Sequence, residues 1–322
     1  MYRSMKHLLT IFAGLLILGA CASSTKTQEI QQGPYTVTVI ADNVYHIQDC
    51  NDANPSGEEF DAEGNKTHFN NCSDIYLCVG DQKALLIDLS NKIEWADNAA
   101  ESLRSIVYDR IGDKELVITF THNHGDHTGM LPAFIDDPKA YFALPEIDFR
   151  PFENLIPKEN SEFYDEGRTF DLGGMKISSL AVPGHTAGSV VFFLEEENIM
   201  FAGDAIGSGH GVWIFDLQAY RNYVDGFAGL VKYIENSGMD KDALKIYGGH
   251  YWQKDWFPEL GEDVFGWQYI LDMQQLIANI ADGTAVTEPS NLNFGTLDTY
   301  FRNGQAIITW NAEFAQQYRT EK

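Results

Sequence analysis

The stretch Thr121-His-Asn-His-Gly-Asp-His-Thr-Gly-Met130 carries the densest group of potential metal ligands in the sequence. Three imidazoles and one carboxylate fall within six of these residues, at His122, His124, Asp126 and His127. The preceding residues, Leu116–Phe120, are apolar and β-branched and predict a buried strand. We therefore expect the cluster where a core strand ends, which is the edge at which α/β sheets commonly bind ligands. Imidazole and carboxylate groups at this density are typical of a zinc or iron site.

Length and composition fit a globular protein with a sizeable core. The chain has 322 residues, of which 44% are hydrophobic and 21% are charged. Its formal net charge of −25 disfavours binding to nucleic acid, because the phosphates would be repelled. The same repulsion disfavours polyanionic substrates in general. We expect a small-molecule substrate and no nucleic-acid partner.

The N-terminus has the pattern of an export signal. Two basic residues, Arg3 and Lys6, precede the apolar run Leu8–Leu18, which is too short to span a bilayer comfortably. The next residues, up to Cys21, resemble the lipobox of bacterial lipoproteins, in which the cysteine is lipidated and becomes the new N-terminus. A plain signal peptide and a short anchor helix are the alternatives.

This pattern predicts how the chain is divided. We expect residues 1–20 to be a lipoprotein signal peptide, residues 21–32 a polar tether and residues 33–322 a single domain. The mature protein would be exported and attached through lipidated Cys21 to the membrane of the cell envelope, on its periplasmic or extracellular face. No later segment is apolar over a length that would cross a membrane.

Three further cysteines remain. Cys50 and Cys72 flank a polar segment, Asn51–Asn71, which is expected to be a lid near the site or a plain surface loop. An oxidising compartment favours joining an exposed pair, so we expect a disulfide between them, with two free thiols as the alternative. Cys78 lies in the apolar run Ile75–Val79 and is expected to be a buried free thiol.

Hydrophobic patterning predicts the order of strands and helices. Strand pairs are expected at residues 35–48, 75–79 with 84–88, 169–182, and 190–194 with 199–202. Single strands are expected at 116–120, 140–144 and 243–247, and helices at 93–111, 131–135, 217–237 and about 263–281. Residues 147–167 are predicted to be irregular, and a C-terminal extension, 283–322, to contain a hairpin centred on Asn303-Gly304.

Three more potential ligands, His185, Asp204 and His250, follow predicted strands. Each has glycine beside it, which gives the backbone room to bend. A carboxylate such as Asp204 has little structural reason to end an apolar strand. Taken singly, each residue is more typical of a satisfied surface side chain than of a metal ligand. Together with the cluster at 122–127 they indicate a metal site.

The four motifs, in this order, resemble the metallo-β-lactamase superfamily. They are His-x-His-x-Asp-His at 122–127, Pro-Gly-His-Thr-x-Gly-Ser around His185, Phe-x-Gly-Asp ending at Asp204 and Gly-His ending at His250. Order and spacing match across about residues 35–255. The resemblance implies an α/β fold class, a four-layer αβ/βα sandwich of two facing mixed sheets with helices outside. It also implies two zinc ions at one edge of the sheets, with iron or manganese as alternatives.

The resemblance also assigns the ligands. It implies one metal on His122, His124 and His185, a second on Asp126, His127 and His250, and Asp204 between the two. Metal binding lowers the pKa of water to about 7, which provides a nucleophile at neutral pH. The implied mechanism is attack by a metal-bridging hydroxide on a carbonyl or phosphoryl centre. Asp126 is expected both to bind metal and to orient this hydroxide, so it is the candidate catalytic residue.

The residue at position 204 separates branches of the superfamily. β-Lactamases of this fold usually have Cys or Ser there, whereas Asp204 resembles the glyoxalase II, lactonase and phosphodiesterase branches. We therefore expect a hydrolase that cleaves an ester-like bond, a lactone or a thioester, in a small molecule. The alternatives are a metallo-β-lactamase acting on β-lactams and a non-catalytic metal-binding surface lipoprotein.

Substrate contacts are expected from segments close to the ligands. His210 lies in the glycine-rich segment Gly207–Gly211. Tyr223 and Tyr251 belong to aromatic segments that would line an apolar pocket, with core packing as the alternative. Their hydroxyls would hold an oxyanion or protonate a leaving group. These three residues are the candidates for substrate binding.

Overall fold

The computed structural model describes residues 29–49, 59–60, 66–68, 72–165, 167–207, 211–250, 265–290, 292 and 294–321. Its helices are α1 (Ala99–Ile111), α2 (Gly125–Thr128), α3 (Glu146–Phe149), α4 (Leu217–Ser237), α5 (Trp267–Asp282) and α6 (Ala312–Thr320). Most strands belong to three sheets, and the short strands β4 (Glu59–Phe60) and β5 (Lys66–His68) pair with each other.

The first sheet has eight strands in the order β1-β2-β3-β6-β7-β8-β9-β10. Their bounds are Glu29–Gln32, Tyr35–Ala41, Val44–Gln48, Asp74–Val79, Lys83–Ile87, Glu115–Thr119, Ala140–Pro145 and Ser161–Tyr164. The second sheet has the order β11-β12-β13-β14-β16, with bounds Thr169–Asp171, Lys176–Ala181, Val190–Leu194, Ile199–Gly203 and Lys245–Gly248. The third has the order β15-β19-β18-β17, with bounds Val212–Trp213, Ala306–Trp310, Thr299–Asn303 and Val286–Pro289.

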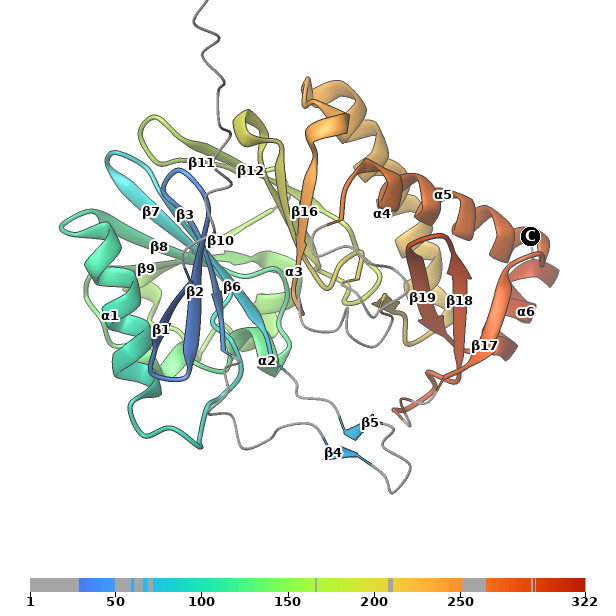
Figure 1. Ribbon diagram of the computed structural model, residues 1–322, viewed down its shortest axis with the longest axis horizontal. Helices are drawn as coiled ribbons and strands as arrows, with labels where there is room; N and C mark the ends of the chain where they lie inside the picture. Colours follow the sequence, from blue (N-terminus) through green and yellow to red (C-terminus); the bar gives the residue numbers. More distant parts are fainter. Residues whose placement is uncertain are drawn as a thin grey trace, which may run out of the picture.

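The first two sheets face each other between helices (Figure 1). Helix α1 covers the outer face of the eight-stranded sheet, and α4 and α5 cover the outer face of the five-stranded sheet. Fully buried side chains such as Leu85 and Phe192 fill the space between the sheets, because both strands are apolar on that face. The four-layer αβ/βα sandwich that the sequence predicted is therefore confirmed.

Strand ends from both sheets meet at the edge that carries the sequence cluster. Strand β8 pairs parallel with β7, and helix α1 forms the connection between them. The carboxyl ends of the two strands therefore lie at the same edge of the sheet. Beyond β8, the Thr121 carbonyl accepts a hydrogen bond from the Val190 N–H of the second sheet at 2.8 Å. The Gly249 carbonyl accepts one from the Asp74 N–H of the first sheet at 2.9 Å. These two bonds bring both sheets together around the candidate site.

The C-terminal extension is part of the main fold rather than an appendage. Strand β15 pairs parallel with β19, so residues 212–213 join the sheet that the extension builds. The predicted hairpin at Asn303-Gly304 is confirmed as β18–β19. Side chains of this sheet, including Trp310, share one buried cluster with α4 and α5. The third sheet therefore packs against the helices that cover the second.

Several boundaries differ from the sequence predictions. The helix expected from residue 93 begins at Ala99, and residues 91–98 form a loop and turn before it. The helix expected at 131–135 is a single 3₁₀ turn, Leu131–Ala133, which contains a proline.

Two segments contain more regular structure than expected. The stretch 147–167, predicted to be irregular, includes part of α3 and all of β10. Both elements have only four residues, which is too short for the hydrophobic pattern to reveal them. Strand β10 pairs parallel with β9. The polar tether predicted up to residue 32 overlaps with β1, because backbone pairing of Glu29–Gln32 with β2 does not require apolar side chains.

Cysteine chemistry agrees in part with the predictions. Cys72 is disulfide-bonded, and Cys78 is a buried free thiol as predicted. The proposed partner Cys50, the lipobox and the signal peptide lie outside the described residues. Among the helices in the described ranges, none combines the length and hydropathy needed to cross a bilayer.

Candidate metal centre

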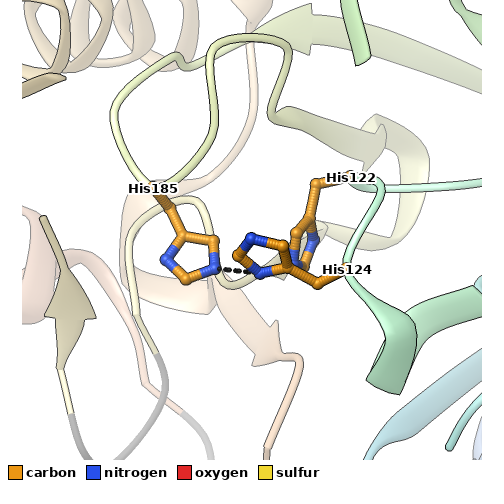
Figure 2. A group of neighbouring side chains, drawn as sticks. All are labelled: His122, His124 and His185. Atoms are coloured by element: carbon orange, nitrogen blue, oxygen red, sulfur yellow. Dashed lines mark hydrogen bonds between the residues drawn. The ribbon is translucent and has the colours of Figure 1, made fainter. Parts of the chain in front are cut away.

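Three imidazoles, termed here the first group, converge on one point (Figure 2). His122 and His124 follow β8, and His185 lies in the turn that follows β12. Their ring centroids are 4.6 to 4.9 Å apart, and His185 Nε2 lies 3.0 Å from His124 Nδ1. In the absence of metal, one of these two nitrogens donates a hydrogen bond to the other. A cation bound by both nitrogens would take the place of that proton.

A second group lies next to the first. It consists of Asp126 and His127, both in the short helix α2, and of His250 after β16, with ligand atoms within 4.8 Å of one another. Asp204, which follows β14, reaches both groups: its Oδ2 lies 3.5 Å from His185 Nε2 and 3.3 Å from His250 Nε2. The structure therefore brings all seven predicted ligands together, with Asp204 between the two groups. Metal binding by these residues stays a prediction.

Buried polar atoms without partners test whether this cluster suits a metal. His122 Nε2, His127 Nε2 and Asp204 Oδ1 are buried and have no hydrogen-bond partner in the part of the chain that the structure describes. His127 Nε2 and Asp204 Oδ1 lie 3.6 Å apart, which is too long for a hydrogen bond. An unsatisfied buried polar atom costs about 1–3 kcal/mol, and a bound cation would remove that cost. Nitrogen and carboxylate donors suit zinc, iron or manganese, so the residues fit such ions.

Asp88, which the sequence analysis missed, orients this cluster. It is buried after β7, and its Oδ1 accepts a hydrogen bond from the Thr121 N–H at 2.7 Å. Its Oδ2 contacts Thr121 Oγ1 at 2.7 Å and His127 Nδ1 at 2.9 Å. With Nδ1 donating to this carboxylate, the free Nε2 of His127 faces the site. The signal was present in the sequence, because Asp88, like Asp204, is a carboxylate that ends an apolar strand.

The other histidines are held in a similar way. His185 Nδ1 contacts the Trp213 carbonyl at 3.0 Å, and His250 Nδ1 contacts the Cys72 carbonyl. In both cases the carbonyl accepts, so the Nε2 atom is left to face Asp204. Backbone carbonyls therefore select the ring tautomer that a metal needs.

Asp148 in α3, also missed, ties two ligand-bearing loops together. One oxygen accepts from the Gly188 N–H at 2.7 Å, and the other accepts from Thr186 Oγ1 at 2.7 Å and from the Asn123 N–H at 3.2 Å. The loop with His122 and His124 is thereby joined to the turn with His185. The prediction of irregular structure over 147–167 concealed this residue.

Glycine beside the ligands is explained by close approach. A Cβ on Gly249 would lie 2.3 Å from Asp204 Oδ1 and 2.7 Å from His127 Cε1. A Cβ on Gly203, whose φ is 49°, would lie 2.4 Å from Thr121 Oγ1. Both positions exclude any larger residue without moving the site.

Burial and charge divide the histidines into two kinds. In the first group, burial lowers the pKa of His122 well below its ordinary value and that of His185 to about 4. Burial also lowers the pKa of His250, but the Asp204 and Asp126 carboxylates outweigh it and raise that pKa to about 9. For Asp204, burial would raise the pKa, but the imidazoles of His250 and His127 hold it well below the usual range. The first group is therefore neutral, which is the form that binds a cation, and Asp204 is ionised.

Of the three residues predicted to contact substrate, only Tyr223 lies within the described residues. Tyr223 lies in α4 with no exposed surface, packs against Gly184, and has a buried hydroxyl without a partner in the described ranges. It belongs to the apolar core around α4 and α5, which corrects the prediction that it contacts substrate. His210 and Tyr251 lie outside the described residues, and their roles stay predictions.

Comparison with known proteins agrees with this geometry. The family model described as the metallo-beta-lactamase superfamily matches residues 72–250. An atrochrysone carboxyl ACP thioesterase of Aspergillus chevalieri is 31% identical over 172 residues, covering 52% of this chain and 48% of that protein. The lactamase-like protein ptaB of Pestalotiopsis fici is 29% identical over 146 residues, covering 45% of this chain and 42% of that protein. These matches span about half the length of the relatives or less.

Solved structures agree on the fold. A metallo-beta-lactamase from Pontibacter korlensis has a TM-score of 0.53 and 16% identity, covering 76% of this chain and 99% of that one. The DIM-1 metallo-beta-lactamase has a TM-score of 0.53 and 13% identity, covering 77% of this chain and 99% of that one. At this identity the likeness shows the fold alone, whereas the family model spans more than half of the chain. With its motifs gathered at one site, the chain belongs to the metallo-β-lactamase superfamily.

Proposed function

We propose that the protein is a hydrolase that cleaves a thioester and holds two zinc ions at the candidate metal centre. Membership of the superfamily indicates a hydrolase. The observation that carries the proposal is Asp204, which lies within 3.5 Å of ligands from both groups. A thioester is preferred over the lactone that the sequence left equally open, because two relatives that are 31% and 32% identical to parts of this chain are named atrochrysone carboxyl ACP thioesterases.

The chain would divide the work between its two groups of ligands. His122, His124 and His185 would hold one ion, and Asp126, His127 and His250 the other, with Asp204 shared. When bound, the pair of ions would acidify water and polarise the carbonyl oxygen of the substrate. The orienting contacts of Asp88 and of the backbone carbonyls keep the histidine rings in place.

Asp126 is the residue best placed to orient the attacking water. Its side chain is 23% exposed, against 16% for Asp204 and 5% for His250, so it is the most accessible carboxylate of the site. It accepts a hydrogen bond from the attacking water and directs the water oxygen toward the thioester carbonyl carbon. The carbon–sulfur bond then breaks, the sulfur leaves as a thiol, and the acyl group is released as a carboxylic acid.

A substrate panel tests the proposal. The zinc-loaded protein would be given an acyl thioester, a chromogenic lactone and a chromogenic cephalosporin, and we expect the highest kcat/KM on the thioester. Asp126→Ala should lower kcat about 100-fold or more, while Asp136→Ala, on an exposed turn, should not. A preference for the cephalosporin would instead assign a β-lactamase, and zinc binding without any turnover would assign a metal-binding protein.

Export and lipid anchoring remain part of the proposal. The basic start, the apolar run and Cys21 support it, whereas the curated relatives reported above are fungal and the lipobox is a bacterial motif. Expression in a bacterial host should place the wild-type chain in the membrane fraction and release the Cys21→Ser variant. Equal amounts of both in the soluble fraction would contradict lipid anchoring.

A further inference from the structure

Three aromatic side chains, Trp213, Phe215 and Phe294, stand beside the first group of histidines; we call them the aromatic wall. The Phe215 ring centroid lies 5.7 Å from that of His185 and 6.4 Å from that of His124. Phe294 continues the wall away from the histidines, at 6.1 Å from Phe215 and 5.7 Å from Trp213. The wall thus begins within contact distance of two predicted ligands.

The wall is accessible, unlike most large aromatic residues in the part of the chain that the structure describes. Phe294 is 54% exposed, and Trp213 and Phe215 are partly buried. The rings of Phe215 and Phe294 meet at 65°, an edge-to-face arrangement that aromatic pairs favour, and the exposed part of Phe294 can contact a further aromatic group. Grouped, partly exposed aromatic rings next to polar groups are typical of ligand sites.

The third sheet holds the wall in place. The Ile214 N–H donates to the Thr309 carbonyl at 3.0 Å, which fixes the segment between the two wall residues Trp213 and Phe215. Thr296 Oγ1 donates to the Phe215 carbonyl at 3.0 Å, which attaches the segment to the loop that carries Phe294. The Trp213 carbonyl also accepts from His185, so the wall and a predicted ligand are positioned by one strand.

This placement gives the C-terminal extension a role at the site. Phe294 and strands β17–β19 lie beyond residues 72–250, the part that matches the family model. The extension therefore adds to a metal centre built by the family region, and the chemistry it adds is an uncharged aromatic surface. Such a surface would discriminate between substrates by their acyl group and not by the type of bond that is cleaved.

We propose that the aromatic wall binds a planar aromatic acyl group, and that Phe215 and Phe294 determine specificity for aryl thioesters. This inference rests on the proposed thioester hydrolysis. Edge-to-face and stacked contacts between aromatic rings favour an aryl group over a small aliphatic one. The chain's charge of −25 further disfavours a strongly anionic acyl group.

A selectivity ratio tests the inference. The ratio of kcat/KM for a 2-naphthoyl thioester to that for an acetyl thioester of the same thiol should fall roughly three- to tenfold in Phe294→Ala and in Phe215→Ala. Phe294→Trp, which keeps an aromatic ring, should retain a high ratio. Tyr141→Ala, which removes a 37% exposed ring from β9, is the matched control and should leave the ratio unchanged. An unchanged ratio in both wall variants would overturn the inference.

A binding measurement separates this inference from the proposed function. In titration calorimetry, the zinc-loaded wild type should bind 2-naphthoate more tightly than acetate, and Phe294→Ala should reduce that difference. If the wild type cleaves no thioester but shows this preference, the function fails and the wall stands. If thioesters are cleaved without any aromatic preference in rate or binding, the wall fails and the function stands.

Discussion

Replacing Asp88 by Asn tests how the second group of ligands is oriented. Asparagine keeps the size of the side chain and tolerates the positive φ of 65° at this position. Its carbonyl oxygen can still accept from the Thr121 N–H, as Asp88 Oδ1 does. Its amide nitrogen would then take the place of Oδ2 and present hydrogens to His127 Nδ1.

The consequence is a change of tautomer. His127 Nδ1 would become an acceptor, so its proton would move to Nε2, the atom that faces Asp204 at 3.6 Å. A protonated Nε2 is unable to bind a cation. The lost bond to a charged acceptor is worth about 1.5–3 kcal/mol, and loss of an orienting partner lowers metal affinity about 10- to 100-fold.

The assay is a zinc titration against a competing fluorescent chelator, with thermal unfolding measured in parallel. We expect the binding constant of the second group to fall by that factor, while that of the first group changes little. Asp136→Asn, on an exposed turn, serves as the control and should match the wild type. Wild-type affinity at both sites in Asp88→Asn would refute the orienting role of this carboxylate.

Three further predictions follow from contacts near the site and in the core. Gly249→Ala places a Cβ 2.3 Å from Asp204 Oδ1 and should reduce the zinc content measured by mass spectrometry. Gly229→Ala, whose added Cβ would have no atom within 4 Å, should leave the zinc content unchanged. Equal zinc content in both variants would contradict the close approach at Gly249. Asp148→Ala leaves the Gly188 N–H without its acceptor and should lower the free energy of unfolding in urea by about 1–3 kcal/mol; an unchanged midpoint would contradict this. Burial raises the pKa of the Cys78 thiol, so this thiol should react with a disulfide reagent at pH 8 only after unfolding, and rapid labelling of the folded protein would show that it is accessible.

The sequence predicted which side chains gather at the candidate metal centre, because the signal for them is local. Each ligand follows an apolar strand and has glycine nearby, and both features are visible within a few residues. The same local periodicity predicted α4 with its observed bounds, Leu217–Ser237. Short strands such as β10 were missed, because four residues carry too little pattern to be distinguished from a loop.

The orienting residues were missed because their partners are distant in sequence. Asp88 is 39 residues from His127, and Asp148 is 40 residues from Gly188. Neither contact leaves a mark on local composition. The aromatic wall depends in the same way on pairing between β15 and β19 and on the bond from Thr296 to the Phe215 carbonyl, which join segments far apart in the sequence. Tertiary contacts of this kind follow from the fold and not from a motif.

We propose that seven side chains form one site for two cations that share Asp204. The most direct measurement is the zinc content of the purified chain by mass spectrometry, after equilibration in a zinc buffer, for the wild type and for Asp204→Ala. We predict two ions per wild-type chain and at most one in Asp204→Ala, with both proteins folded by circular dichroism. A wild type that retains no zinc, or an Asp204→Ala variant that retains two ions at unchanged affinity, would contradict a shared two-cation site.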